Sequence, residues 1–143
     1  MIIYETSTEY KKVGTITHKT LDEPEAVQAY MVGAFDEHPM QEQVWVIMLN
    51  RKNFPIGRQM VTLGTNVGCL LNPSSVFRPV IVSGATACIL CHNHPSGDPS
   101  PSSADMQVTK KIAEAGKALD IAVHDHVIIG HESFYSFNDK GLL

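Results

Sequence analysis

Hydrophobic residues along the chain fall into short runs that predict buried strands. The run at 44–49 is continuously apolar, as expected of a central strand buried on both faces, and it is followed after a polar turn by a second run at 56–63, so the two predict a β-hairpin. A third run, 86–91, ends in a stretch rich in proline, glycine and serine, which indicates a buried strand that delivers the next residues to the end of a sheet. Weaker patterns predict strands at 12–17, 121–129 and 133–137.

Helix-start signals precede three further segments. Acidic residues and a proline open the segment 20–35, and an asparagine followed by proline opens the segment 73–83. Pro79 lies inside the second of these, so either it kinks the helix or the helix consists of two short pieces. A Ser-x-x-Asp pattern opens the third segment, 102–119.

The order of these elements predicts an α/β fold, with a single mixed β-sheet flanked by helices. At 143 residues, of which 43% are hydrophobic, the chain has room for one compact domain with its own core. We therefore expect a single domain over residues 1–143. Within it, residues 1–38 would form an N-terminal extension of a strand and a helix, and residues 39–143 would form the core.

The candidate chemistry follows the strand predicted at 86–91. Residues two apart on a strand share a face, so His92 and His94 can offer two imidazoles to one metal ion. Asp105 stands in the first turn of the next predicted helix, where its carboxylate can reach across the intervening loop to the same ion. Two histidines and one carboxylate with an open position form a catalytic zinc arrangement, whereas closed structural sites more often use cysteine.

Ser102 and Asp105 also have a purely structural interpretation. They stand three residues apart at the start of a helix, as the two members of a capping box do. Taken alone, this pair is more often a cap than a part of a metal site. The His-x-His-Pro sequence a short distance before it favours the metal-ligand interpretation.

The segment 92–105 reads H-x-H-P, six residues, then S-x-x-D, and it resembles the motif of the JAMM (MPN+) metalloproteases at matching spacing. The fuller string from His92 to Asp105, together with the segments 125–130 and 141–143, is similar to the RadC family within that superfamily. The similarity runs from about Glu42 to the C-terminus. The family's usual N-terminal helix-hairpin-helix DNA-binding domain has no counterpart in these residues, and two serines, at 74 and 75, replace its usual basic-acidic pair.

The resemblance implies a JAMM-like fold for residues 39–143 and a zinc-dependent metalloprotease that cleaves a peptide or isopeptide bond in a peptide or protein substrate. Zn²⁺ held by the two histidines and Asp105 would lower the pKa of its bound water to about 7 and polarise a carbonyl group. Ser102 would then donate a hydrogen bond to the tetrahedral oxyanion.

The resemblance also implies a general base. Glu42 occupies the position of the family's glutamate, just before the first core strand, and would move a proton from water to the leaving amine. By composition alone, Glu42 is a solvated charge at a strand end. Glu37 is the rival base if the alignment is shifted.

A second His-x-His pattern, at His124 and His126, could be mistaken for another pair of ligands. Asp125 and His126 recur in the RadC pattern, whereas His124 has no such match. We therefore expect a supporting hydrogen bond from these two residues beside the metal site. His131 falls in a predicted turn and is expected to be solvated.

The charge pattern argues against nucleic acid as the main partner. Eleven lysines and arginines stand against fifteen aspartates and glutamates, which gives a net charge of −4, and the basic pairs are scattered along the chain. DNA binding is therefore expected to be weak. We also expect a cytoplasmic protein without membrane contact, because no signal-like start and no apolar run of spanning length is present.

Three cysteines, Cys69, Cys88 and Cys91, are expected to be buried thiols because the chain carries no secretion signal. The pair Cys88-x-x-Cys91 resembles a redox or zinc motif. However, residues three apart on a strand face opposite ways, so the two sulfur atoms are not expected to converge.

Two other functions compete with hydrolysis. An HNH nuclease is disfavoured because that motif spreads its residues over a ββα unit, whereas the H-N-H letters here are consecutive. In the second alternative, the chain is a DNA-repair-associated or partner-binding module with weak or no hydrolysis. The complete set of candidate ligands favours catalysis over this alternative.

Overall fold

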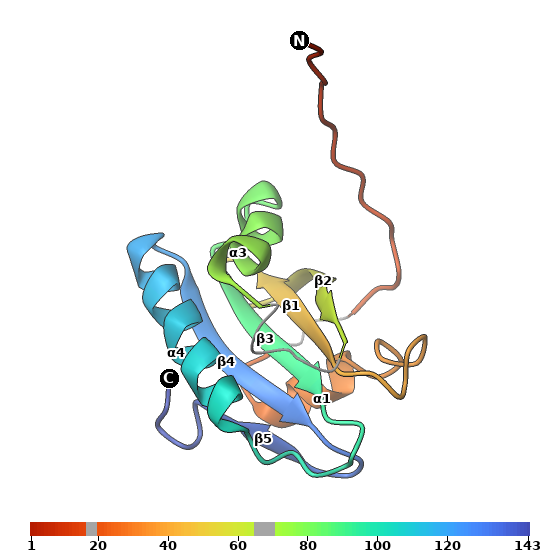
Figure 1. Ribbon diagram of the computed structural model, residues 1–143, viewed down its shortest axis with the longest axis vertical. Coiled ribbons are helices and arrows are strands. Elements are labelled where there is room, and N and C mark those ends of the chain that lie inside the picture. Colours follow the sequence, from red (N-terminus) through yellow and green to blue (C-terminus); the bar gives the residue numbers. More distant parts are fainter. Residues whose placement is uncertain (17–19, 65–70) are drawn as a thin grey trace.

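A five-stranded mixed sheet forms the centre of the fold (Figure 1). In this computed structural model, which describes residues 1–16, 20–64 and 71–143, the strands are β1 (Gln43–Leu49), β2 (Pro55–Leu63), β3 (Ala87–Asn93), β4 (Ala122–Ile129) and β5 (Phe134–Ser136). Their order across the sheet is β2-β1-β3-β4-β5, with β3 and β4 parallel and the other neighbouring pairs antiparallel. This confirms the predicted α/β fold and hairpin, and it is consistent with the MPN-like fold that the resemblance implies.

Helices cover both faces of the sheet. The helices are α1 (Pro24–Tyr30), α3 (Pro73–Val82) and α4 (Ser103–Ala118). One hydrophobic cluster packs α3 and α4 against one face, and a second cluster packs α1 against the other (Figure 1). Of the helices in the described ranges, none combines the length and the hydropathy needed to cross a bilayer.

The two central strands alternate their side chains between these clusters. On β3, Cys88 and Leu90 face α3 and α4, whereas Ile89 and Cys91 face α1. The two free thiols therefore lie on opposite faces, as predicted. Burial raises the pKa of the Cys88 thiol to about 12 and raises that of Cys91 as well, so neither is reactive at neutral pH. Cys69 lies outside the described residues.

Strand β4 contains one extra residue opposite β3. Cys88 pairs with Val123 and Ile89 pairs with Asp125, which leaves His124 as a β-bulge. Side chains two apart normally share a face, but after this bulge Val123 packs on the α3–α4 side while Val127 packs on the α1 side. His126 consequently faces His92.

The N-terminal predictions are partly wrong. Residues 12–16 form no strand, and residue 17 lies outside the described ranges. The alternating pattern there does not supply a partner strand, and Figure 1 shows the segment 1–16 running away from the sheet as an extended tail. The helix predicted at 20–35 is shorter, because turns follow Tyr30 and Gly33 takes a positive φ of 83°.

The other predicted elements are present with small shifts at their ends. Helix α3 continues through Pro79 as one piece, so of the two alternatives the one with two short helices is wrong. Its start is fixed by Asn72, whose side chain accepts a hydrogen bond from the amide of Ser75 in a capping box.

Candidate metal centre

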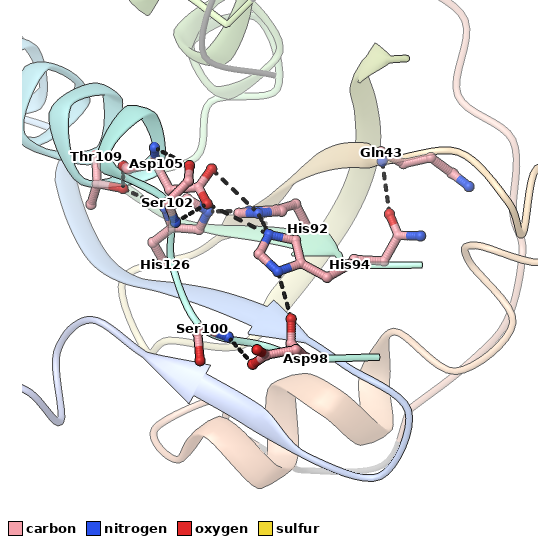
Figure 2. Close-up of polar contacts among 10 residues, drawn as sticks. Gln43, His92, His94, Asp98, Ser100, Ser102, Asp105, Thr109 and His126 are labelled. Atoms are coloured by element: carbon pink, nitrogen blue, oxygen red, sulfur yellow. Dashed lines mark hydrogen bonds and ion pairs between the residues drawn. The ribbon is translucent and has the colours of Figure 1, made fainter. Parts of the chain in front are cut away.

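Strand β3 places the two histidines of the candidate site. His92 is fully buried near the end of the strand, on the face that packs against α4. His94 lies one residue beyond the strand, where its amide donates a hydrogen bond to the carbonyl of Ile129 on β4 (2.9 Å). The two rings face each other, as Figure 2 shows, and their Nε2 atoms are 3.0 Å apart. The shared face that strand periodicity predicts is therefore present.

The first turn of α4 brings Asp105 to the same point. Ser102 is the N-cap; its hydroxyl oxygen accepts from the amide of Asp105 (3.0 Å), and Asp105 Oδ2 accepts from the amide of Ser102 (2.8 Å). Asp105 Oδ1 also lies 3.6 Å from His92 Nε2, and Oδ2 lies 3.5 Å from His94 Nε2. The two interpretations of this pair are thus compatible, because the capping box aims the carboxylate at the histidines.

Among the residues that the structure describes, His92, His94 and Asp105 form the one group able to hold a metal ion, with ligand atoms within 4.8 Å of one another. Two imidazole nitrogens and a carboxylate oxygen are ligands that zinc accepts. His94 Nδ1 donates to the carbonyl oxygen of Asp98 (2.8 Å), which directs Nε2 toward the other two ligands. The donor set and its geometry therefore fit a metal ion.

The electrostatics keep two of the three groups in ligand form. Burial lowers the pKa of His92 well below that of a free imidazole, and the neighbouring His126 lowers it further. Burial alone would raise the pKa of Asp105, but hydrogen bonds from His94 and Ser102 and the nearby His92 hold it below its usual range. The pKa of His94 is raised by its interaction with Asp105, with burial acting against this.

Glu42 immediately precedes β1, and its backbone is fixed from both sides. The side chain of Asn93 accepts a hydrogen bond from the amide of Gln43 (2.7 Å) and donates one to the carbonyl of Gln41 (3.1 Å). The Glu42 carbonyl accepts from the amide of Gly64 (2.9 Å). The position of Glu42 is therefore tied to β3 at the residue between the two histidines.

The carboxyl group of Glu42 is within electrostatic reach of the site. Partial burial raises its pKa, His94 opposes this effect and Asp105 adds to it. Glu37, the rival base, lies exposed in the turns that follow α1.

His92 makes a supporting contact with His126, which the sequence predicts only in part. His126 is completely buried, and its Nε2 is 2.7 Å from His92 Nδ1, which confirms the expected hydrogen bond beside the site. Burial lowers the pKa of His126 to about 4, so its ring is neutral at physiological pH. Asp125 has a different part: its carboxylate accepts from Ser136 (2.6 Å) and from the amide of Asn138 (3.0 Å).

Two further histidines, His124 and His131, do not belong to this cluster. His124 is exposed and contacts Asn53 (3.0 Å), and His131 is exposed, as predicted.

Sequence reasoning missed Thr109 and Asn93. Thr109 stands four residues after Asp105, a spacing that places both on one face of a helix and could have identified it. The role of Asn93 depends on a strand some fifty residues away, which no local pattern reveals.

Comparison with known proteins supports the resemblance that the sequence motif indicated. A family model described as a RadC-like JAB domain matches residues 21–142. A UPF0758 protein of Flavobacterium johnsoniae is 45% identical over 101 residues, which are 71% of this chain and 44% of that protein. UPF0758 proteins of Chlorobaculum parvum and Symbiobacterium thermophilum are 42% identical over 114 residues (80% of this chain, 51% of theirs) and 43% identical over 106 residues (74% and 45%). The chain spans about half the length of the curated relatives it matches.

Proposed function

We propose, because the chain belongs to the family of RadC-like JAB domains, that it is a zinc-dependent metallohydrolase acting on a peptide or isopeptide bond. The observation that carries the proposal is the convergence of His92, His94 and Asp105 on one point, within electrostatic reach of a partly buried glutamate, Glu42. Zinc at this point would supply a Lewis acid that lowers the pKa of water to about 7 and polarises a substrate carbonyl.

The protein's own groups would do the rest of the chemistry. His92, His94 and Asp105 would hold the ion. Glu42 would accept a proton from the attacking water and return it to the leaving amine, and a raised pKa suits a group that must both take and release a proton near neutral pH.

Ser102 would stabilise the oxyanion that forms from the substrate carbonyl. Its hydroxyl oxygen already accepts a hydrogen bond from the amide of Asp105, so the hydroxyl hydrogen is available for donation to substrate. Such a donor typically contributes about 3–4 kcal/mol to the lowering of the barrier.

The first test measures metal and turnover in the same set of variants. The parent protein should bind one zinc ion per chain by elemental analysis, and His94→Ala should lose it because one ligand is gone. A panel of fluorogenic peptides and isopeptide-linked substrates should then reveal cleavage by the zinc-loaded parent. Full zinc occupancy in the His94→Ala protein would disprove the site.

Glu42→Gln separates the base from the ligands. This variant should keep its zinc and lose about 10²–10⁴-fold in turnover, because an amide cannot accept the proton. Glu37→Gln is the matched control and should retain parental turnover, since Glu37 is exposed away from the site. The reverse result would assign the base to Glu37. Zinc binding without any cleavage would instead favour a DNA-repair-associated or partner-binding module.

A further inference from the structure

A chain of buried polar side chains runs from α4 through β4 to the back of His92. Thr109 Oγ1 lies 2.6 Å from His126 Nδ1, and His126 Nε2 lies 2.7 Å from His92 Nδ1 (Figure 2). The exposed fractions of these residues are 1% for Thr109 and 0% for both histidines. No bulk water reaches them, so their polar hydrogens must be donated to one another or to neighbouring protein groups.

A backbone carbonyl sets which group donates and which accepts in this series of hydrogen bonds. Thr109 Oγ1 lies 2.6 Å from the carbonyl oxygen of Asp105, one turn earlier on α4. A carbonyl oxygen can only accept, and a hydroxyl has a single hydrogen, so Thr109 must donate to Asp105. The hydroxyl oxygen is then left as an acceptor toward His126, and His126 Nδ1 must carry the hydrogen that it receives.

The hydrogen positions on the two imidazole rings follow in the same way. With its hydrogen on Nδ1, a neutral His126 presents a bare Nε2, so the contact with His92 requires the hydrogen to be on His92 Nδ1. His92 Nε2 is then also bare. That nitrogen faces His94 Nε2 and Asp105 Oδ1, which is where a ligand needs its lone pair.

We propose that Thr109 and His126 are positioning residues that fix the tautomer of His92, so that Nε2 is always the electron-pair donor toward the metal. The inference rests on the proposed metal site. In it, Thr109 orients the hydrogen bonds of His126, and the backbone carbonyl of Asp105 orients the hydroxyl of Thr109. Asp105 thus contributes twice: its side chain is a proposed metal ligand, and its backbone carbonyl accepts the first hydrogen bond of the series that ends at His92.

The alternative hydrogen pattern shows what Thr109 prevents. If His126 carried its hydrogen on Nε2, His92 Nδ1 would have to accept, and the hydrogen of His92 would move to Nε2, where it blocks metal binding. Stacking on Phe137, with ring centroids 4.9 Å apart and an interplanar angle of 9°, also holds the plane of the His126 ring. The ring is therefore hindered from tilting away from these two hydrogen bonds. Loss of such a supporting hydrogen bond typically weakens metal binding by about 10- to 100-fold.

Thr109→Val and Thr109→Ser form a matched pair for the test. Valine keeps the shape and removes the hydroxyl, whereas serine keeps the hydroxyl. Zinc affinity, measured by competition with a chelator, should fall by about 10- to 100-fold in Thr109→Val and stay within a few-fold of the parent in Thr109→Ser. Equal affinity in the parent and in Thr109→Val would overturn the proposal, as would equal losses in both variants.

The tautomers can be read directly by nitrogen NMR of the imidazoles in the zinc-free protein. The parent should show hydrogen on Nδ1 of both His92 and His126, and Thr109→Val should lose this preference. Hydrogen on Nε2 of His126 in the parent would overturn the proposal even if neither variant folded. A parent that binds no zinc would refute the proposed function, whereas the tautomer pattern would still decide the present inference.

Discussion

Asn93, the residue between the two histidines, joins the two strands from which the candidate chemistry comes. Its amide binds the backbone on both sides of Glu42, so any shift of β3 moves the proposed base and the proposed ligands together. Because both partners are backbone groups, these bonds do not occupy the carboxyl group of Glu42. The geometry between the proposed base and the proposed metal ligands is thus held by a side-chain amide that belongs to neither.

Protonation at the level of single residues predicts how zinc binding depends on pH. The pKa of His94 is raised in the metal-free protein, whereas those of His92 and Asp105 are lowered. As the pH falls through the pKa of His94, which lies above the 6.5 of an ordinary imidazole, a proton competes with the ion for Nε2. Zinc affinity should therefore weaken as the pH falls through this pKa, and the number of protons released per bound ion should rise toward one over the same pH range.

Chelator competition across this range, with calorimetry in two buffers of different ionisation enthalpy, measures both the affinity and the proton count. An affinity that is flat across this range would show that His94 is not a ligand.

Local periodicity explains why the convergence of the three candidate ligands could be predicted. His92 and His94 follow from the two-residue repeat of a strand, and Asp105 follows from the first turn of a capped helix. Asn93 is joined to the backbone at the start of β1, and His126 on β4 contacts His92 on β3, so the pairing of strands brings these residues to the site. Sequence patterns describe one segment at a time and do not contain that pairing.

At the level of elements, the loop after β3 depends on close contact with the turn after β4. Gly97 has a φ of 92°, and the amide of His131 donates to its carbonyl (3.2 Å). A β-carbon on Gly130 would collide with that same carbonyl oxygen. The loop also carries Asp98, whose carbonyl orients His94. The packing of these two glycines therefore supports one of the proposed ligands.

Gly130→Ala should accordingly lower both stability and zinc affinity. Backbone would have to move to admit the methyl group, at a cost of about 1–3 kcal/mol in the free energy of unfolding, and the Asp98 carbonyl would shift away from His94. Gly84→Ala is the control: its φ of 72° is also unfavourable for alanine, about 1–2 kcal/mol, but a β-carbon there meets no atom within 4 Å. Chemical denaturation and chelator competition on both variants compare the effects. Parental zinc affinity in Gly130→Ala would show that the loop is not needed to place His94.

The predictions for whole elements succeeded where burial dictates the pattern and failed where it does not. The run at 44–49 became β1 because apolar side chains on both faces must be covered, and both hydrophobic clusters use it. The weaker, alternating pattern at 12–17 also predicted a strand, but it contains no continuous apolar run that must be covered on both faces. Its described part, 12–16, has no neighbour to pair with and remains an exposed tail.

For the molecule as a whole, charge predicts weak binding to DNA. A net charge of −4 with scattered basic residues offers little neutralisation of phosphates, so affinity should be no tighter than roughly 10⁻⁴ to 10⁻⁶ M at physiological salt. Titrations of labelled duplex and single-stranded DNA, with and without zinc, measure this. Nanomolar binding would favour the DNA-associated alternative over hydrolysis.

The bulge at His124 makes the site depend on the number of residues in β4 as well as on their identity. A chain without this residue could bury Val123 with α3 and α4 or turn His126 toward His92, but it could not do both, because the strand repeats every two residues. The side chain at 124 is itself exposed and open to substitution. Substitution of the residue at position 124 should therefore be tolerated, whereas its deletion should take either Val123 away from α3 and α4 or His126 away from His92.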